Sequence, residues 1–150
     1  MKTNRPEVVL LINPNNPIGN VINKKEILNL LSELKEFKII VDESFIDFYY
    51  QDESVLNMIN DFNNLIIVKS YGKTIGMPGV RVGAIYSNIN YISAMRKKVP
   101  EWNVNSIAAY ILNLMTKQEF RNNILDSLKM ITYDTAQLYN SLKKIENIKV

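Results

Sequence analysis

The chain has 150 residues, of which 47% are hydrophobic and 22% are charged, with 18 basic and 15 acidic side chains. This size and balance predict one soluble globular domain with a sizeable core and exclude a mainly disordered chain. The sequence contains no cysteine and no histidine. Disulfides, zinc sites of the usual kinds and serine–histidine catalysis are therefore excluded, we expect no metal, and lysine, carboxylates and tyrosine remain for any chemistry.

The net charge of +3 is scattered along the chain and forms no block of like charge. This distribution favours neither a nucleic acid nor a membrane surface as a partner. The first apolar run, residues 8–12, is too short for a signal peptide core or a membrane span. Because the absence of cysteine also allows a reducing compartment, we expect a cytoplasmic protein.

The run at residues 8–12 is continuously apolar and predicts a strand buried on both faces. The loop that follows, residues 13–20, contains two prolines, which restrict the backbone around them. The side-chain amide of Asn16 should therefore be held in a set direction. The alternative is a plain turn, since Asn, Pro and Gly are turn residues in any case.

Asn23 can cap a helix over residues 24–37, and its apolar residues lie on one face. A buried strand, residues 38–41, follows and ends at Asp42. Acids at the carboxyl ends of parallel strands lie where open α/β sheets bind ligands. The alternative for a lone aspartate is a solvated loop position.

A short helix at residues 54–59 and a third strand at residues 65–68 complete an alternation that predicts right-handed crossovers and a parallel sheet. A fourth strand, residues 82–86, should be antiparallel because its connection is short. Further helices are predicted at residues 90–97 and 106–115. A long amphipathic helix should fill residues 117–145, with these residues on one side: Ile124, Leu128, Ile131, Thr135, Leu138 and Leu142.

Residues 70–83 contain four of the five glycines and follow the third strand directly. Glycines permit tight turns and close approach of a ligand to the backbone. Ser70 and Arg81 can donate hydrogen bonds to a phosphate there. Lys73 is then the candidate reactive amine, since a partly desolvated lysine can form a Schiff base with an aldehyde. The alternative is a solvated surface lysine.

Four motifs together resemble the fold-type I pyridoxal-phosphate enzymes, and especially the branch of histidinol-phosphate aminotransferases and threonine-phosphate decarboxylases. They are Asn-Pro-Asn-Asn-Pro-Ile-Gly at 13–19, Val-Asp-Glu-Ser-Phe at 41–45, Ser70 with Lys73 and Arg81, and Trp-Asn-Val-Asn at 102–105. Their order and spacings make the resemblance stronger than any one motif, and it covers essentially the whole chain.

The resemblance implies a role for five residues toward pyridoxal 5′-phosphate. Lys73 would bind the cofactor as a Schiff base and then move the proton at the substrate's α carbon. Asp42 would pair with the pyridine nitrogen and keep it protonated. Asn16 would donate a hydrogen bond to the phenolic oxygen, while Ser70 and Arg81 would bind the phosphate.

The sequence departs from the family pattern at two positions. Phe45 stands where the family often has a tyrosine that also bonds the phenolic oxygen, and Gly72 stands where many relatives have a second hydroxyl. The segment around Phe45 looks more like the threonine-phosphate decarboxylase side of the branch. Both changes leave cofactor binding in place and the reaction type open.

The resemblance also implies the architecture, an α/β fold that is part of a pyridoxal-phosphate transferase large domain. Its sheet should have about three parallel strands and one antiparallel strand, flanked by helices. Residues 1–116 would be the latter part of that domain, and residues 117–150 a connecting helix and the start of a small C-terminal domain. Relatives are well over twice this length, and an uncovered sheet edge favours self-association, so we expect a homodimer or another assembly.

The function implied is that of an aminotransferase fragment acting on an amino acid or a phosphorylated amino compound, a small-molecule substrate. A threonine-phosphate decarboxylase-like lyase and a catalytically silent scaffold are the alternatives. A phosphate-binding module of another kind, indifferent to Asp42, is a further one. Transamination and decarboxylation differ in which α bond stands perpendicular to the cofactor ring, and the sequence leaves that choice open.

Overall fold

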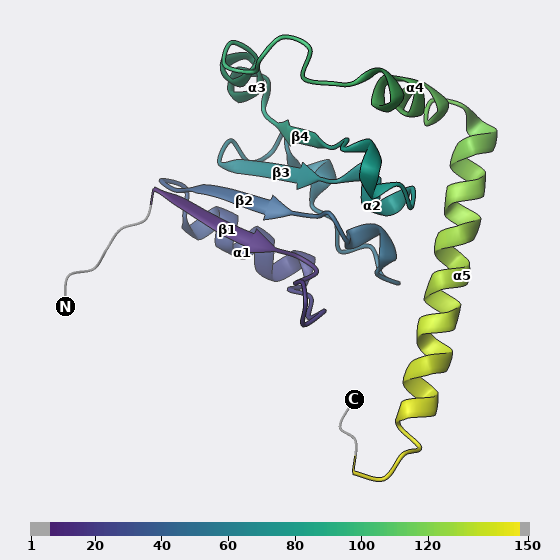
Figure 1. Cartoon of the computed structure of the whole chain (residues 1–150). Coiled ribbons are helices and arrows are strands. Elements are labelled where there is room, and N and C mark those ends of the chain that lie inside the picture. The colour runs from purple at the N-terminus through teal and green to yellow at the C-terminus, as the bar shows by residue number, and fades with distance from the viewer. Residues whose placement is uncertain (1–6, 148–150) are drawn as a thin grey trace.

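One mixed sheet, in the order β1-β2-β3-β4, lies at the centre of the fold (Figure 1). The structure is a computed structural model and describes residues 7–147. Strands β1 (Val8–Ile12), β2 (Lys38–Asp42) and β3 (Leu65–Lys69) are parallel to one another, and β4 (Ala84–Ser87) is antiparallel to β3. The predicted α/β class, with three parallel strands and one antiparallel strand, is confirmed.

Helix α1 (Lys24–Glu33) supplies the layer over one face of the sheet. The Asn23 side chain accepts a hydrogen bond from the Glu26 backbone at 2.9 Å, and the Glu26 side chain accepts one from the Asn23 backbone. This reciprocal capping box fixes where the helix starts. The helix ends earlier than the predicted residue 37, because the chain must turn back for Lys38 to pair with β1.

The core lies between α1 and the sheet. Every second residue of the strands points its side chain toward α1. Ile27 and Leu31 of α1 are 1% and 0% exposed, and they pack with fully buried residues of the strands and of the β2–β3 connection. Those residues are Ile39, Val41, Val55, Leu65 and Ile67. The parallel register places the members on β2 and β3 side by side, and Val9 and Leu11 of β1 pack next to them, so one apolar layer spans three strands.

Strand β1 is buried on one face only, and the prediction that both its faces are buried is wrong. Val8, Leu10 and Ile12 are 48%, 60% and 38% exposed, while Val9 and Leu11 pack against the core. The reason is its position, because β1 is an edge strand and α1 covers only one side of it. The apolar run correctly predicted a strand, but it did not predict how many faces of that strand are covered.

The buried carboxylate of Glu43 organises the connection from β2 to β3. Its oxygens accept hydrogen bonds from the Val55 backbone N–H at 2.8 Å and from Ser54 Oγ at 2.7 Å. A buried charge of this kind requires such partners. Because residues 54 and 55 are tied down in this way, the predicted helix at residues 54–59 is reduced to a 3-10 turn, η2 (Leu56–Met58).

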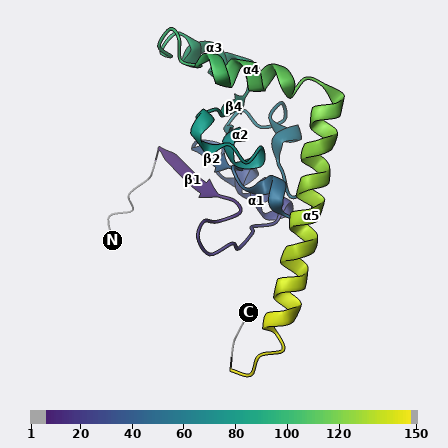
Figure 2. The same cartoon turned by 45° about the vertical axis from the view of Figure 1, so that its right-hand side comes forward.

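Three helices follow the sheet: α3 (Ile89–Arg96), α4 (Ser106–Leu114) and α5 (Gln118–Leu142). The predicted helices are confirmed, with ends that differ by at most three residues, and β4 begins two residues later than predicted. Helix α5 runs down one side of the molecule and contacts the 3-10 turn η1 (Ile46–Phe48) (Figure 2). None of its residues is buried. The sequence also predicts that a strand begins at Ile148, and this position lies outside the described residues.

Across residues 7–147 we find no helix with the length and hydropathy needed to cross a membrane.

Candidate functional site

The three parallel strands end at one edge of the sheet, and most of the candidate residues lie there. Ile12 is in register with Asp42, and Asp42 with Val68. Backbone hydrogen bonds continue one step beyond the strands, from Asn13 N to Asp42 O at 2.9 Å and from Glu43 N to Val68 O at 2.8 Å. The sequence therefore brings the loops after β1, β2 and β3 together at the carboxyl edge, where open α/β sheets bind ligands.

Asp42 is the last residue of β2, and its side chain is half-buried. Alternation along the strand puts it on the face opposite α1, since Val41 and Glu43 on either side are buried on the core side. Its Oδ1 accepts a hydrogen bond from the Ser44 backbone N–H at 2.9 Å. This bond fixes the carboxylate at the strand end and leaves Oδ2 for another donor.

Lys73 is carried by a single helical turn, α2 (Tyr71–Thr74), immediately after β3. Sequence reasoning predicted only a permissive turn here. Gly72 is buried within this turn, and Gly76, at φ +67°, lets the chain leave it. The Lys73 side chain is exposed, with Nζ 5.4 Å from the centroid of the Phe45 ring. Its amine is thus directed toward the loop that follows Asp42.

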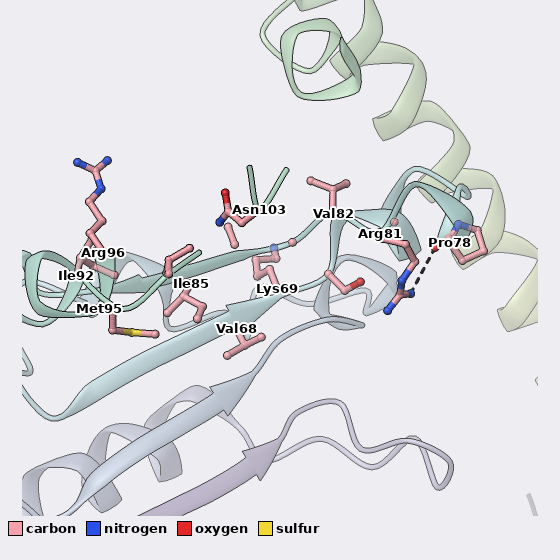
Figure 3. A pocket seen from close by; sticks show the side chains of 15 residues that line it. Val68, Lys69, Pro78, Arg81, Val82, Ile85, Ile92, Met95, Arg96 and Asn103 are labelled. Atoms are coloured by element: carbon pink, nitrogen blue, oxygen red, sulfur yellow. Dashed lines mark hydrogen bonds between the residues drawn. The ribbon is translucent and has the colours of Figure 1, made fainter. Parts of the chain in front are cut away.

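The predicted phosphate-binding residues line one hollow of about 470 Å³ between β3, β4 and α3 (Figure 3). Ser70, Gly72, Arg81 and Gly83 are among its lining residues. Gly83 is required because a Cβ there would lie 2.6 Å from the Lys69 carbonyl oxygen. Arg81 is exposed and has φ +58°, and its Nη1 donates to the Pro78 carbonyl at 3.5 Å. At that length the bond is weak, so the guanidinium keeps its capacity for an anion.

The same hollow extends away from the strand ends toward α3, as Figure 3 shows. Ile92, Met95 and Arg96 line that far end. Sequence reasoning did not predict this extension, since the three residues only show the ordinary spacing of one helix face.

Asn16 lies apart from Ser70 and Arg81, in a second hollow of about 280 Å³. Phe45 and Tyr49 line the same hollow. The Asn16 side chain is exposed, and the hydrogen bonds of the described residues include none from it. The rigid part of its loop is anchored instead by the buried Asn13, whose side chain donates to the Ile22 carbonyl at 3.0 Å and accepts from the Ile22 N–H at 2.8 Å.

The structure therefore brings the five predicted residues to one sheet edge but not into one cavity. Ser70 and Arg81 share a hollow, Asn16 lines another, and Phe45 borders both that second hollow and Lys73. Asp42 belongs to the strand between the two loops. The anchoring role of Asn13 was missed, although its place at the end of an apolar strand was a usable signal.

A carboxylate that sequence reasoning did not single out lies beside the Lys73 turn. Asp47 in η1 accepts a hydrogen bond from Lys69 Nζ at 2.8 Å through Oδ1, and from Thr74 Oγ1 at 2.6 Å through Oδ2. The Lys69 and Asp47 side chains are 11% and 24% exposed. No sequence signal distinguished Asp47, because its partners are 22 and 27 residues further along the chain.

Tyr71 packs against β4, and its hydroxyl forms a hydrogen bond with that of Tyr86. Burial, and to a smaller extent this hydrogen bond, raises the pKa of Tyr71 well above its usual value. The Tyr71 hydroxyl is therefore harder to deprotonate than that of an exposed tyrosine.

The sequence profile of the aminotransferase class I and II family matches residues 1–150. The chain belongs to that family. This aminotransferase-family chain is 32% identical over 146 residues to a histidinol-phosphate aminotransferase of Clostridium novyi, covering 97% of this chain and 40% of that protein. It is 33% identical over 156 residues to an L-serine phosphate decarboxylase of Campylobacter jejuni, covering 100% and 40%.

A solved structure of a decarboxylase from Sulfurospirillum multivorans superimposes with a TM-score of 0.85 at 35% identity, covering 97% of this chain and 43% of that one. The aminotransferase-family fold is thus present over nearly all of the chain. The chain spans about 40% of the length of the curated relatives that it matches. The family as a whole is pyridoxal-phosphate-dependent.

Proposed function

We propose that this chain supplies the lysine, the ring-facing carboxylate and the phosphate-binding groups of a pyridoxal-phosphate site in an aminotransferase. The substrate would be an amino acid or a phosphorylated amino compound. The observation that carries the proposal is the convergence of three loops at the carboxyl edge of the sheet, with Ser70 and Arg81 lining one hollow there. When bound, the cofactor supplies an electron sink for the bond broken at the substrate's α carbon.

The residues at this edge fit the chemical groups of the cofactor. Ser70 offers a neutral donor and Arg81 a fork of charged donors, which together suit a phosphate dianion. The absent side chain at Gly83 keeps the hollow open where the chain passes the Lys69 carbonyl. These features support a phosphate end of the site next to the Lys73 turn.

Lys73 and Asp42 carry the chemical roles in the proposal. Lys73 would hold the cofactor through its aldehyde and would move a proton at the substrate's α carbon. Asp42 would keep a proton on the pyridine nitrogen, and its anchored Oδ1 keeps the carboxylate at the end of β2. Asn16 would donate to the phenolic oxygen, and Phe45 has no hydroxyl with which to add a second bond.

A decarboxylase of a phosphorylated amino acid is the second candidate function. Two observations favour it: the identity of 33% to an L-serine phosphate decarboxylase and the likeness to a solved decarboxylase structure. The residues that orient the substrate decide between the two reactions. Four further expectations stay predictions. They are a scaffold without activity, a cytoplasmic location, a homodimer, and a domain boundary between residues 116 and 117.

The first experiment combines absorption spectroscopy with borohydride reduction after addition of pyridoxal phosphate, followed by peptide mapping. We expect a long-wavelength band and a label concentrated on Lys73. Lys73→Ala should abolish both, while Lys117→Ala, which removes an exposed lysine before α5, should leave both unchanged. A label spread evenly over the lysines of the wild-type chain would overturn the proposal for this chain.

The phosphate half of the proposal has its own test, in which pyridoxal replaces pyridoxal phosphate. Arg81→Ala should weaken labelling by pyridoxal phosphate by about tenfold, the size expected for loss of one charge-assisted contact, and should leave labelling by pyridoxal unchanged. Arg96→Ala, at the other end of the hollow, is the matched control. An equal loss with both aldehydes would show that Arg81 does not act through the phosphate.

A further inference from the structure

We propose that Asp47 is a positioning residue that holds the Lys73 turn in place and keeps the neighbouring Lys69 away from the cofactor's aldehyde. This inference rests on the proposed function. It concerns a carboxylate outside the predicted site, and it explains how one lysine could be selected where two lie four residues apart at the same sheet edge.

The geometry gives each oxygen of Asp47 a separate task. Oδ1 binds Lys69 Nζ at 2.8 Å, and Oδ2 binds Thr74 Oγ1 at 2.6 Å. Lys69 is the last residue of β3, and Thr74 is the residue after Lys73 in α2. One carboxylate therefore ties together the strand before the turn and the turn itself.

Other hydrogen bonds tie this turn to neighbouring segments, from Gly72 N to Val82 O and between the Tyr71 and Tyr86 hydroxyls, but they lie at its first two residues and not at Thr74. Helix α2 is four residues long, too short to be stable on its own, and its N-cap residue Ser70 makes no side-chain capping bond. Asp47 itself lies in η1, which is in contact with α5. The Asp47 contacts thus connect α2 to a part of the fold that is fixed independently.

The ion pair also separates the two amines chemically. Lys69 Nζ is engaged by Asp47 and its side chain is 11% exposed, whereas Lys73 is exposed and its Nζ lies over the Phe45 ring, 5.4 Å from the centroid. A lysine amine that is held in a partly buried ion pair reaches an aldehyde less easily than an exposed amine does. Asp47 therefore favours reaction at Lys73.

The test maps pyridoxal phosphate labelling after borohydride reduction in Asp47→Asn, Thr74→Val and Thr74→Ser. Asp47→Asn keeps the side-chain size but loses the ion pair, and we expect labelling at Lys73 to fall about tenfold and labelling at Lys69 to appear. Thr74→Val should lower Lys73 labelling about threefold without exposing Lys69, and Thr74→Ser should restore it.

Asp126→Asn is the matched control, because the Asp126–Lys129 pair has the same 2.8 Å distance but side chains that are 69% and 77% exposed. It should label like the wild type. Should Asp47→Asn fail to fold, judged by circular dichroism, the Thr74 pair still decides, since valine and serine differ in the hydrogen bond.

The outcomes separate this inference from the proposed function. Lys73 labelled equally in wild type, Asp47→Asn and Thr74→Val would overturn the role of Asp47 and leave the proposed function standing. A wild-type chain without preference for Lys73 would overturn the proposed function, and the positioning role with it. A shift of label from Lys73 to Lys69 in Asp47→Asn alone would support both.

Discussion

Helices α1 and α5 have the same kind of amphipathic sequence but very different burial. In α1, Ile27 and Leu31 are 1% and 0% exposed, since the helix packs on the sheet. In α5, which is 25 residues long, no residue is buried, and Leu138 is 60% exposed. Periodicity therefore identifies a helix and its apolar face, whereas burial depends on whether another surface of the fold meets that face.

The largest expected effect contrasts these two helices directly. Leu31→Ala should reduce the free energy of unfolding by about 3 kcal/mol, because it leaves a cavity beneath α1. Leu138→Ala removes the same atoms from the exposed face of α5 and should change it by less than about 0.5 kcal/mol. Urea unfolding followed by circular dichroism measures both. Similar losses in the two variants would mean that α5 packs on something in solution, such as a second copy.

A smaller effect is expected at the helix starts. Asn23→Ala removes the side chain that caps α1 and should cost about 1 kcal/mol. Lys117 occupies the equivalent position before α5 and makes no side-chain capping bond, so Lys117→Ala should cost almost nothing. The same unfolding measurement compares them. A cost for Asn23→Ala no larger than that for Lys117→Ala would contradict the capping box.

The smallest expected effect concerns pH. Because the pKa of Tyr71 is raised in the folded state, its contribution to stability is complete below its ordinary pKa of about 10 and is lost as pH rises toward the folded value. The melting temperature should therefore fall as the pH rises above about 10, and fall less in Tyr71→Phe.

The matched control for that measurement is Tyr133→Phe in α5, where the tyrosine is 64% exposed. It should follow the wild-type pH profile. A Tyr71→Phe profile that coincides with the wild type would show that this hydroxyl titrates normally.

Much of the fold was predictable because its signals are local. The cap at Asn23 fixed the start of α1, and the short connection after β3 predicted the antiparallel β4. The 3-10 turn at Leu56–Met58 was not predictable in this way, because the carboxylate that shapes it is Glu43, in an earlier part of the chain. Strand residues alternate between the two faces of the sheet. Had this alternation been extended one residue past β2, it would have predicted that Glu43 is buried.

The candidate site was predictable in composition and less so in arrangement. Motif spacing selected Asp42, Ser70, Lys73, Arg81 and Asn16, and the parallel topology brings their loops to one edge. The separation of Asn16 from the hollow of Ser70 and Arg81 follows from how each loop packs. The contact between Lys73 and Phe45 likewise joins segments that no local pattern links.

The sequence by itself determined the strands, most of the helices, the chemical groups at the strand ends and the family. Local propensity and motif spacing are properties of neighbouring residues, so they can be read along the chain. Only the tertiary structure decided which faces are covered, that β1 is open on one side, and that Asp47 joins Lys69 to Thr74. These depend on contacts between residues distant in sequence, which exist only once the sheet has assembled.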